Sequence, residues 1–489
     1  MRFFDQVTFL EARALITGSY TVPSRSEMVA ITQAVGRVTA APVMAAFDLP
    51  GEDRCLMDGC AIQSVETLGA RDQTPVPLPS AIPVESGEPL PPGCDAVVMV
   101  EELERSGSGF STRKAARAGQ HVRRAGGEVR AGAVIIPAGH RIRPDEVGAL
   151  VACGIERILV RALHVALLPV GQGLVPPGTR PGAGEVIESN TTRASAFLSG
   201  RGVDCRPLPA IPGSVEEVRA ALSTATVDVD LVLVFGGISK GANDGAAGAI
   251  REEGEVVFHG VAMQPGRPTL AGRVRDVPII ALPGYPFAAG VVLRELVAPL
   301  LCAWGFPPTV TDPTVQVELA RTVASEVGID EFVPLTLGFV DGRWVAYPRA
   351  RAPASHLADI GPHAFLHIPG GVEGYEAGTV QDVRLTAGER VIGRTLLVHG
   401  EAGPLLERLV ASASSQGLHV EPIGGRAVTA HEAIRARRCH LAVIEEKGCP
   451  SLIAPTGADQ RLQSVIEACR PIIAEQFPPG DKGVYNKKD

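Results

Sequence analysis

Between His164 and Leu301 the chain alternates short apolar runs with amphipathic segments, and this rhythm restricts the fold more than any other feature. Buried strands are predicted for HVALLPV, DLVLVF and VPIIALPG, and helices for SNTTRASAFLSGRG, SVEEVRAALSTA and PFAAGVVLRELVAPLL. Alternating strands and helices form a mostly parallel sheet with helices on both faces, because each parallel connection needs a crossover. The sequence therefore predicts a three-layer α/β domain over residues 164–306.

Each of these predicted strands ends in a loop rich in glycine or proline. The loops are Gly171-Gln172-Gly173, the segment GGISKGANDG over 236–245, and Leu282-Pro283-Gly284-Tyr285-Pro286. One such loop alone is typical of an ordinary turn. In a doubly wound sheet, however, ligands bind at the carboxyl ends of the strands, where backbone amides approach an anion. Three loops in one domain favour a phosphate-bearing ligand.

Two charged residues add to this prediction. Asp244 lies within GGISKGANDG, whose amides, hydroxyl and Lys240 ammonium suit phosphate, and its carboxylate is a candidate ligand for a hard cation such as Mg²⁺. The alternative is that Asp244 caps the following helix. Arg267, in Met263-Gln264-Pro265-Gly266-Arg267-Pro268, carries a planar fork that suits phosphate or carboxylate, and the alternative is a solvated turn charge.

The flanking regions differ from the α/β domain in pattern. Helical spacing is found near the start and over Ser26–Val38, and Pro144-Asp145-Glu146 opens another predicted helix. Short runs such as AIPV, CDAVVMVEEL and GAVIIPAG, separated by Gly/Pro turns, predict β structure. We expect a helical lead segment over 1–46 and 141–163, a β-rich domain over 47–140, the α/β domain over 164–306, a small β-barrel-like domain over 307–388, an accessory α/β domain over 389–477 and a tail over 478–489.

Composition excludes several classes of protein. The net charge of −8 and the pI near 5.8 argue against a nucleic-acid surface, which needs a basic face. No uninterrupted apolar run reaches the roughly 18 residues of a membrane span, and the first residues lack the apolar core of a signal peptide. Nine scattered cysteines without a C-x-x-C pair are typical of a cytoplasmic protein with free thiols. His363 and His367, in a strand-like segment, would lie about 13 Å apart, which is too far for a shared metal.

Six motifs occur in one order along the chain: LMDGCAI, VESGEPLPPGCDAVVMVEE, GHRIRPDEVGALVACGI, VFGGISKGANDG, VAMQPGRPTLAGR and LPGYPFAAGV. Over residues 1–385 the chain resembles the MoeA family of molybdopterin molybdenumtransferases, of which gephyrin carries a related module. The resemblance implies a multidomain α/β plus β protein. Its central molybdopterin-binding α/β domain has β-rich domains on either side, and a small α/β unit follows at the C-terminus. It also implies an elongated homodimer with an active cleft shared between subunits.

The reaction that the resemblance implies is Mg²⁺-assisted insertion of molybdate into adenylylated molybdopterin, with release of AMP. Cations and hydrogen-bond donors would offset the negative charge that gathers there. Partners would be an upstream adenylyltransferase and a molybdo- or tungstoenzyme. By position, the resemblance assigns catalysis to Asp58, Ser86 and Asp244, and metal binding to Asp58 and Asp244. It assigns pterin and phosphate binding to Gly236, Gly237, Ser239, Lys240, Gly241, Pro265, Arg267, Pro283 and Pro286.

The chain departs from the family pattern at acidic positions. The family's T-G-D-E-L is Val170-Gly171-Gln172-Gly173-Leu174 here, and its D-D-P is Pro212-Gly213-Ser214. Two alternatives to the transferase therefore stand. One is a pterin-binding chaperone that holds cofactor for a molybdoenzyme; Glu185 and Glu188, which lie nearby in sequence, are candidate substitutes that would instead restore carboxylates to a transferase. The other is a CinA-like nucleotide-processing enzyme, which would explain neither LMDGCAI nor the P-G-R-P segment.

The C-terminal α/β unit is an addition to the common family architecture. HEAIRARRCHLAVIEE and the terminal Val484-Tyr485-Asn486 are weakly similar to the periplasmic-binding-protein-like domain that is fused to some MoeA proteins. That resemblance implies an oxyanion-sensing or partner-docking module. At about 90 residues the unit is small for a two-lobed binding domain. A structural or dimer-supporting role is therefore an equal alternative.

Overall fold

The computed structural model describes residues 6–107, 109–238, 245–308, 312–351, 353–355, 358, 360–400, 404–415, 417–424, 427–446, 449–454, 463 and 467. The chain divides into two compact units. Unit 1 combines Met1–Val22 with His164–Asp489, and unit 2 is Pro23–Leu163. Unit 2 is therefore an insertion between the first helix of unit 1 and the first strand of its central sheet.

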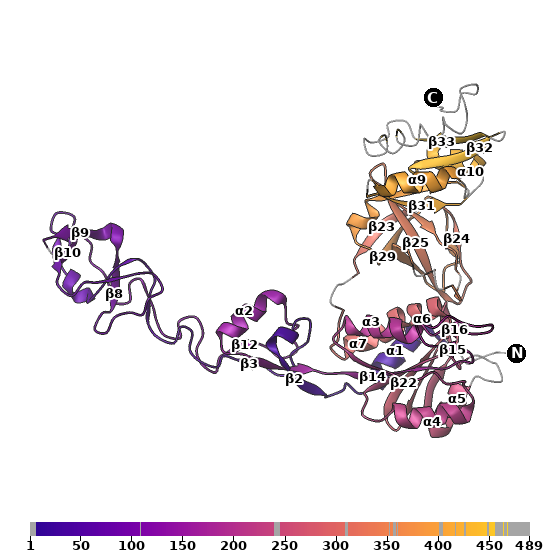
Figure 1. Cartoon of the computed structure of the whole chain (residues 1–489), viewed down its shortest axis with the longest axis horizontal. Helices are drawn as coiled ribbons and strands as arrows, with labels where there is room; N and C mark the ends of the chain where they lie inside the picture. Colours follow the sequence, from indigo (N-terminus) through magenta and orange to yellow (C-terminus); the bar gives the residue numbers. More distant parts are fainter. Residues whose placement is uncertain are drawn as a thin grey trace. The chain divides into compact units, whose positions relative to one another are not determined.

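The central sheet of unit 1 has six strands in the order β17-β14-β18-β22-β21-β19. The first four strands run parallel, and β21 and β19 close the edge in antiparallel fashion. The expected three-layer α/β domain is confirmed: α3, α6, α7 and α1 cover one face, and α4 and α5 the other (Figure 1). The bounds are β14 His164–Pro169, α3 Asn190–Ser199, β17 Asp204–Pro207, α4 Val215–Ala225, β18 Leu231–Phe235, α5 Gly245–Glu253, β19 Gly254–His259, β21 Leu270–Val274, β22 Val277–Leu282, α6 Pro286–Val292 and α7 Ala298–Ala303.

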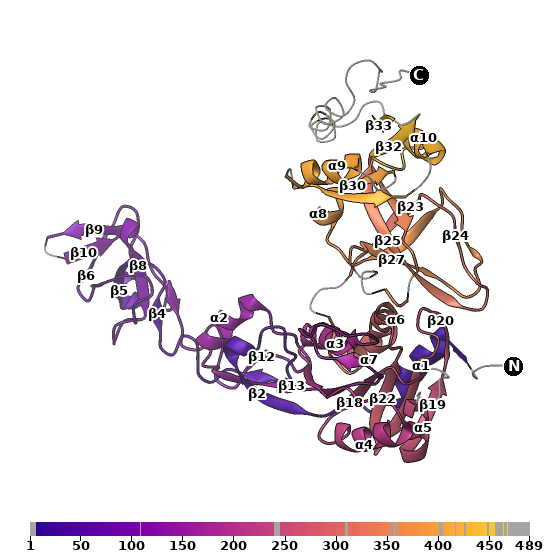
Figure 2. The same ribbon diagram turned by 45° about the vertical axis from the view of Figure 1, so that its right-hand side comes forward.

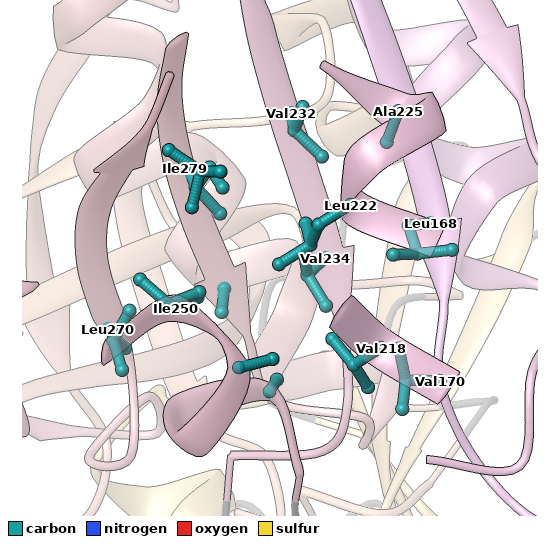
Figure 3. Packing of buried hydrophobic residues seen from close by; sticks show 14 of the residues in the cluster. Leu168, Val170, Val218, Leu222, Ala225, Val232, Val234, Ile250, Leu270 and Ile279 are labelled. Atoms are coloured by element: carbon teal, nitrogen blue, oxygen red, sulfur yellow. The ribbon is translucent and has the colours of Figure 1, made fainter. Parts of the chain in front are cut away.

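Apolar residues on both faces bury this sheet. In β18, Val232 and Val234 face α4 and α5, where they meet Val218 and Leu222 (Figure 3). Leu231, Leu233 and Phe235 alternate to the other face, and the whole strand is buried. A strand that is apolar at every position is stable only between two helical layers, which is why the run LVLVF predicts its own place in the sheet.

The helix α4 begins as its sequence predicts. Ser214 is the N-cap: its hydroxyl accepts a hydrogen bond from the Glu217 amide at 3.3 Å, and the Glu217 carboxylate accepts from the Ser214 amide at 2.9 Å. This capping box satisfies donors that the first turn leaves unpaired.

The apolar stretch Pro286–Ala303 passes through α6, a π-helical turn over Leu293–Val297, and α7. It is long and apolar enough to cross a membrane, but 78% of it is buried inside the protein. Its neighbours include α1 (Phe9–Ser19) and α3. The stretch is therefore the core helix of the α/β domain.

The predicted small β domain is a closed barrel of five strands in the order β25-β26-β23-β29-β27, with β27 pairing back to β25 (Figure 2). From the α/β domain, β20 adds to β25 and β1 adds to β20, both in parallel. The bounds are β1 Val7–Thr8, β20 Val261–Gln264, β23 Thr314–Leu319, β25 Asp330–Val340, β26 Arg343–Pro348, β27 Ala364–Ile368 and β29 Val380–Leu385, with a separate β24–β28 pair at Val323–Ala324 and Gly374–Tyr375.

The C-terminal α/β domain, which is part of unit 1, contains a four-stranded sheet in the order β31-β30-β32-β33, parallel except at β33. It shares a buried apolar cluster with the barrel, in which Tyr347 and Val345 of β26 pack with Leu397 and Cys439. Arg349 and Glu421 form an ion pair across this contact at 3.3 Å. The bounds are α8 Glu389–Ile392, β30 Thr395–His399, α9 Pro404–Ser415, β31 His419–Ile423, α10 Ala427–Arg435, β32 Leu441–Glu446 and β33 Cys449–Ile453.

Unit 2 is built from small sheets, as its Gly/Pro punctuation predicts. Two sheets have three strands, β7-β5-β8 and β6-β10-β9, and the remainder are two-stranded. The predicted second helix of the lead segment, over Ser26–Val38, is wrong: Ser26–Ala30 is strand β2, which pairs with β13. The bounds are β3 Val43–Met44, β4 Arg54–Cys55, β5 Gly59–Ile62, β6 Val76–Leu78, β7 Ile82–Val84, β8 Ala96–Met99, β9 Leu103–Ser106, β10 Gly109–Thr112, β11 Val122–Arg123, β12 Val134–Ile136, α2 Pro144–Ala152 and β13 Arg157–Arg161.

Candidate functional site

A cavity of about 600 Å³ opens at the carboxyl ends of β14, β18 and β22. After β14 the chain leaves through α3 to β17 on one side, and after β17 it crosses through α4 to β18 on the other. This reversal of direction leaves a crevice between β14 and β18, which is where open α/β sheets bind ligands. The lining is Val170, Gly171, Gln172, Leu174, Val186, Ile187, Glu188, Ser189, Asn190, Pro212, Phe235, Gly236, Gly237, Ile238, Pro268, Pro283, Gly284, Tyr285, Pro286 and Ala354.

Glycine is required at the centre of the cavity. Gly236 has a φ of +97°, and a Cβ atom there would lie 2.2 Å from the carbonyl oxygen of Val170. At Gly237, with a φ of +68°, a Cβ atom would lie 2.8 Å from the Val170 side chain. The ends of β14 and β18 therefore approach this closely only because positions 236 and 237 carry no side chain.

His259 supports the loop that begins at Gly236. Its Nε2 lies 3.2 Å from the carbonyl oxygen of Ile238, and Nη2 of Arg251 lies 3.1 Å from its Nδ1. Because an arginine only donates hydrogen bonds, Nδ1 accepts and Nε2 carries the proton donated to Ile238. The imidazole thereby fixes Ile238, the last described residue before position 239.

Glu188 closes the amino end of α3 at the cavity wall. Its side chain is buried, and Oε1 accepts hydrogen bonds from the amides of Asn190 at 2.8 Å and Thr191 at 3.1 Å. Oε2 accepts from the Thr191 hydroxyl. A carboxylate in this position also complements the positive end of the helix dipole. Glu188 is therefore occupied by its own helix.

Asn190 connects this helix end to the loop after β22. Its Nδ2 donates to the carbonyl oxygen of Gly284 at 2.9 Å, and the residue is only 8% exposed. Tyr285, the next residue of that loop, is 61% exposed at the rim of the cavity. The sequence prediction assigned no role to either residue. The sequence features that could have identified them are the polar S-N-T step at the start of a helix, for Asn190, and an aromatic residue inside a Pro-Gly loop, for Tyr285.

The structure brings together four of the predicted binding residues, Gly236, Gly237, Pro283 and Pro286, in the cavity lining. Pro265 and Arg267 are not part of the lining, which the neighbouring Pro268 joins instead. The Arg267 side chain is partly exposed, and its Nη2 lies 3.6 Å from Oε2 of Glu326. The predicted residues Ser239, Lys240, Gly241 and Asp244 lie outside the described residues.

The structure also brings Asp58 and Ser86 together, in unit 2. The Ser86 amide donates to Oδ1 of Asp58 at 2.7 Å, and the Ser86 hydroxyl donates to the carbonyl oxygen of Leu56 at 3.0 Å. Position 59 requires glycine, because a Cβ atom there would lie 2.0 Å from the carbonyl oxygen of Val98. Two positions that are 28 residues apart thus form one exposed polar cluster.

The described residues offer no ready magnesium site. Among them, no group of three or more His, Cys, Asp and Glu side chains is arranged to hold a metal. Gln172 and Pro212 line the cavity where the family pattern is acidic, and Glu188 is engaged as above. The carboxylate of Glu185 accepts from the Gly182 amide at 2.8 Å. The described lining therefore does not fit Mg²⁺, so we derive no step through that ion.

Comparisons with known proteins match both units. A model of the MoeA N-terminal region (domain I and II) matches residues 7–154, and a model described as a probable molybdopterin binding domain matches residues 166–303. Molybdopterin molybdenumtransferase 2 of Mycobacterium tuberculosis is 32% identical over 381 residues, which are 72% of this chain and 93% of that protein. The molybdopterin molybdenumtransferase of Bacillus subtilis is 26% identical over 385 residues, covering 74% and 90%.

A solved structure of similar fold is the molybdopterin biosynthesis MoeA protein from Pyrococcus horikoshii. It has a TM-score of 0.67 at 27% identity, and the match covers 78% of this chain and 100% of that chain. The cavity and its three loops all lie within the region that matches the binding-domain model, apart from Ala354.

Proposed function

Because the chain belongs to the MoeA family of molybdenum cofactor biosynthesis, we propose that it is a molybdopterin molybdenumtransferase. It binds adenylylated molybdopterin in the cavity of unit 1 and inserts molybdate at the dithiolene, while the pyrophosphate bond to the adenylyl group breaks and AMP is released. The observation that carries this proposal is the cavity itself, which lies at the switch point of the sheet where three strands end in loops that contain glycine.

The residues present favour recognition of a ligand that is part apolar ring and part phosphate. Val170, Phe235 and Ile238 give the cavity an apolar lining, and the backbone of Gly237 lies partly exposed beside them. Polar backbone at a strand end binds phosphate without a large charged side chain. In the proposal Asp58 and Ser86 act on the substrate, as the family resemblance implies, and the active form is a homodimer in the cytoplasm.

The second candidate is a chaperone that binds the pterin without turnover. A specific observation favours it: Gln172 and Pro212 stand at cavity positions where the family pattern has carboxylates, and Glu188 is held by its own helix. The third alternative, a CinA-like enzyme, is disfavoured because residues 7–154 match the MoeA N-terminal region.

One assay separates the two candidates. The purified protein is incubated with adenylylated molybdopterin, Mg²⁺ and molybdate, and bound pterin, AMP and finished cofactor are measured. The transferase releases AMP in proportion to cofactor formed. Bound pterin without AMP release supports the chaperone, and absence of binding contradicts both candidates.

Variants test the role of unit 2 in the same assay. Asp58→Ala is expected to remove turnover and leave pterin binding in unit 1 unchanged. Asp72→Ala is the matched control, since Asp72 is an exposed carboxylate of the same unit outside the cluster of Asp58 and Ser86. Equal turnover of both variants would show that Asp58 is not in the site.

A further inference from the structure

Among the described residues, the wall of the cavity contains one buried acceptor without a hydrogen-bond partner. The Asn190 Nδ2 donates to the carbonyl oxygen of Gly284, and this fixes the orientation of the amide because a carbonyl only accepts. Oδ1 is then turned away, and it is buried without a hydrogen-bond partner in the described structure. Asn190 is part of the cavity lining and its Oδ1 is closed to solvent, so a ligand in the cavity supplies the missing donor through a small shift of the groups that cover Oδ1. An unpaired buried acceptor is costly, which makes such a position informative.

Phosphate does not supply that donor. The oxygens of an ionised phosphate accept hydrogen bonds and would repel Oδ1. The group that satisfies Oδ1 carries an N–H or O–H. The ligand group that reaches Oδ1 is therefore not an ionised phosphate.

The surroundings of Asn190 suit a flat ring. Tyr285 follows Gly284, whose carbonyl Asn190 holds, and its largely exposed side chain lies at the cavity rim. Aromatic rings stack on planar heterocycles with useful affinity and little entropy cost. Val186 and Ile187 add apolar lining close to Asn190 in sequence. An acceptor and an aromatic side chain thus converge on one end of the cavity.

We propose that Asn190 and Tyr285 form a subsite for a flat heterocycle that bears an N–H donor, with Oδ1 accepting that hydrogen and the Tyr285 ring stacking on the heterocycle. The inference deepens the proposed function and rests on it for the identity of the ligand. Adenylylated molybdopterin contains two such rings, the pterin and the adenine, which share this chemistry. The experiment distinguishes them.

The test compares each ring with a version that lacks its N–H donors. Affinities of the full-length protein are measured for pterin against N2,N2,N3-trimethylpterin, and for AMP against N6,N6-dimethyl-AMP. One hydrogen bond predicts a preference of about tenfold for the donor-bearing member of one pair. The pair that shows it identifies the ring in the subsite.

Variants connect the preference to the two side chains. Asn190→Ala is expected to reduce the preference to about onefold, whereas a merely structural role would weaken both members of the pair equally. Tyr285→Ala is expected to weaken both by about tenfold, and Tyr285→Phe to leave both unchanged. If Asn190→Ala does not fold, the affinities of the wild-type protein for the two ligand pairs still test the subsite.

The inference is overturned if neither pair is discriminated, or if Asn190→Ala keeps the full preference. Failure of the proposed function looks different. A protein that discriminates the pair but releases no AMP keeps the subsite and loses the transferase, while one that turns over without discrimination keeps the transferase and loses the subsite.

Discussion

Replacing Glu188 with alanine should loosen the start of α3, because the carboxylate accepts three hydrogen bonds there. Leaving a buried donor unpaired costs about 1–3 kcal/mol. Two of the donors are first-turn amides beside the cavity, which water partly resatisfies once the side chain is gone. We therefore expect Glu188→Ala to lower the free energy of opening this turn by about 2–4 kcal/mol.

The measurement is hydrogen–deuterium exchange of the peptide that contains Asn190 and Thr191. Since about 1.4 kcal/mol corresponds to a tenfold change in an equilibrium constant, Glu188→Ala should accelerate exchange there by about 30- to 700-fold. Glu188→Gln keeps an acceptor but loses the charge, and should accelerate it by about fivefold. Glu185→Ala is the control, because among the described residues that carboxylate accepts from the Gly182 amide alone, in an exposed turn.

The competing hypothesis makes the opposite prediction. If Glu188 replaces one of the missing acidic metal ligands, Glu188→Ala should lower Mg²⁺ affinity and leave exchange in α3 unchanged. That pair of results would refute the assignment of Glu188 to its helix.

Three further predictions concern the rest of the chain. Gly59→Ala should destabilise unit 2 by several times more than Gly69→Ala, because both glycines have positive φ but only the first would place a Cβ atom 2.0 Å from a carbonyl of β8; similar rates of proteolysis of the two variants would contradict this. Burial acts to raise the pKa of Glu146, but hydrogen bonds from the backbone and from a histidine and an arginine lower it to about 2, so its contribution is present above the ordinary pKa of about 4.5 and is lost as pH falls toward 2. The difference in melting temperature between the wild type and Glu146→Gln should therefore shrink on acidification, and a constant difference would exclude the ionised carboxylate as its source. Burial raises the pKa of the Cys439 thiol to about 12, so iodoacetamide at pH 8 should modify the exposed Cys302 and spare Cys439 in the folded protein, as read by peptide mass spectrometry.

The α/β domain was predictable because its signals are local. A strand such as Leu231–Phe235 is apolar at every position, and Ser214 and Glu217 mark a helix start within four residues. The helix predicted at Ser26–Ala30 was wrong for the opposite reason. Its apolar spacing fits a short helix or a strand equally well, and the choice is made by pairing with Arg157–Arg161, far along the chain.

The site was predictable in part for the same reason. Glycines after strands mark Gly236 and Gly237 as backbone that a ligand can approach, and the structure places them in the cavity. The role of Asn190 was not visible, because it depends on a contact with Gly284 that is 94 residues away. The contact between Asp58 and Ser86 likewise appears only in the folded unit.

The insertion of unit 2 has a consequence for the order in which the protein is built on the ribosome. Val7 pairs with Val261, and the Tyr20 hydroxyl donates to the carbonyl oxygen of Gly272 across 252 residues. Unit 2 contains only residues 23–163, so it has all its partners before those residues are synthesised. Protease protection of stalled nascent chains should therefore appear in unit 2 well before α1. The helix α1 therefore leaves the ribosome before unit 2 but packs only after residues 261 and 272 are made.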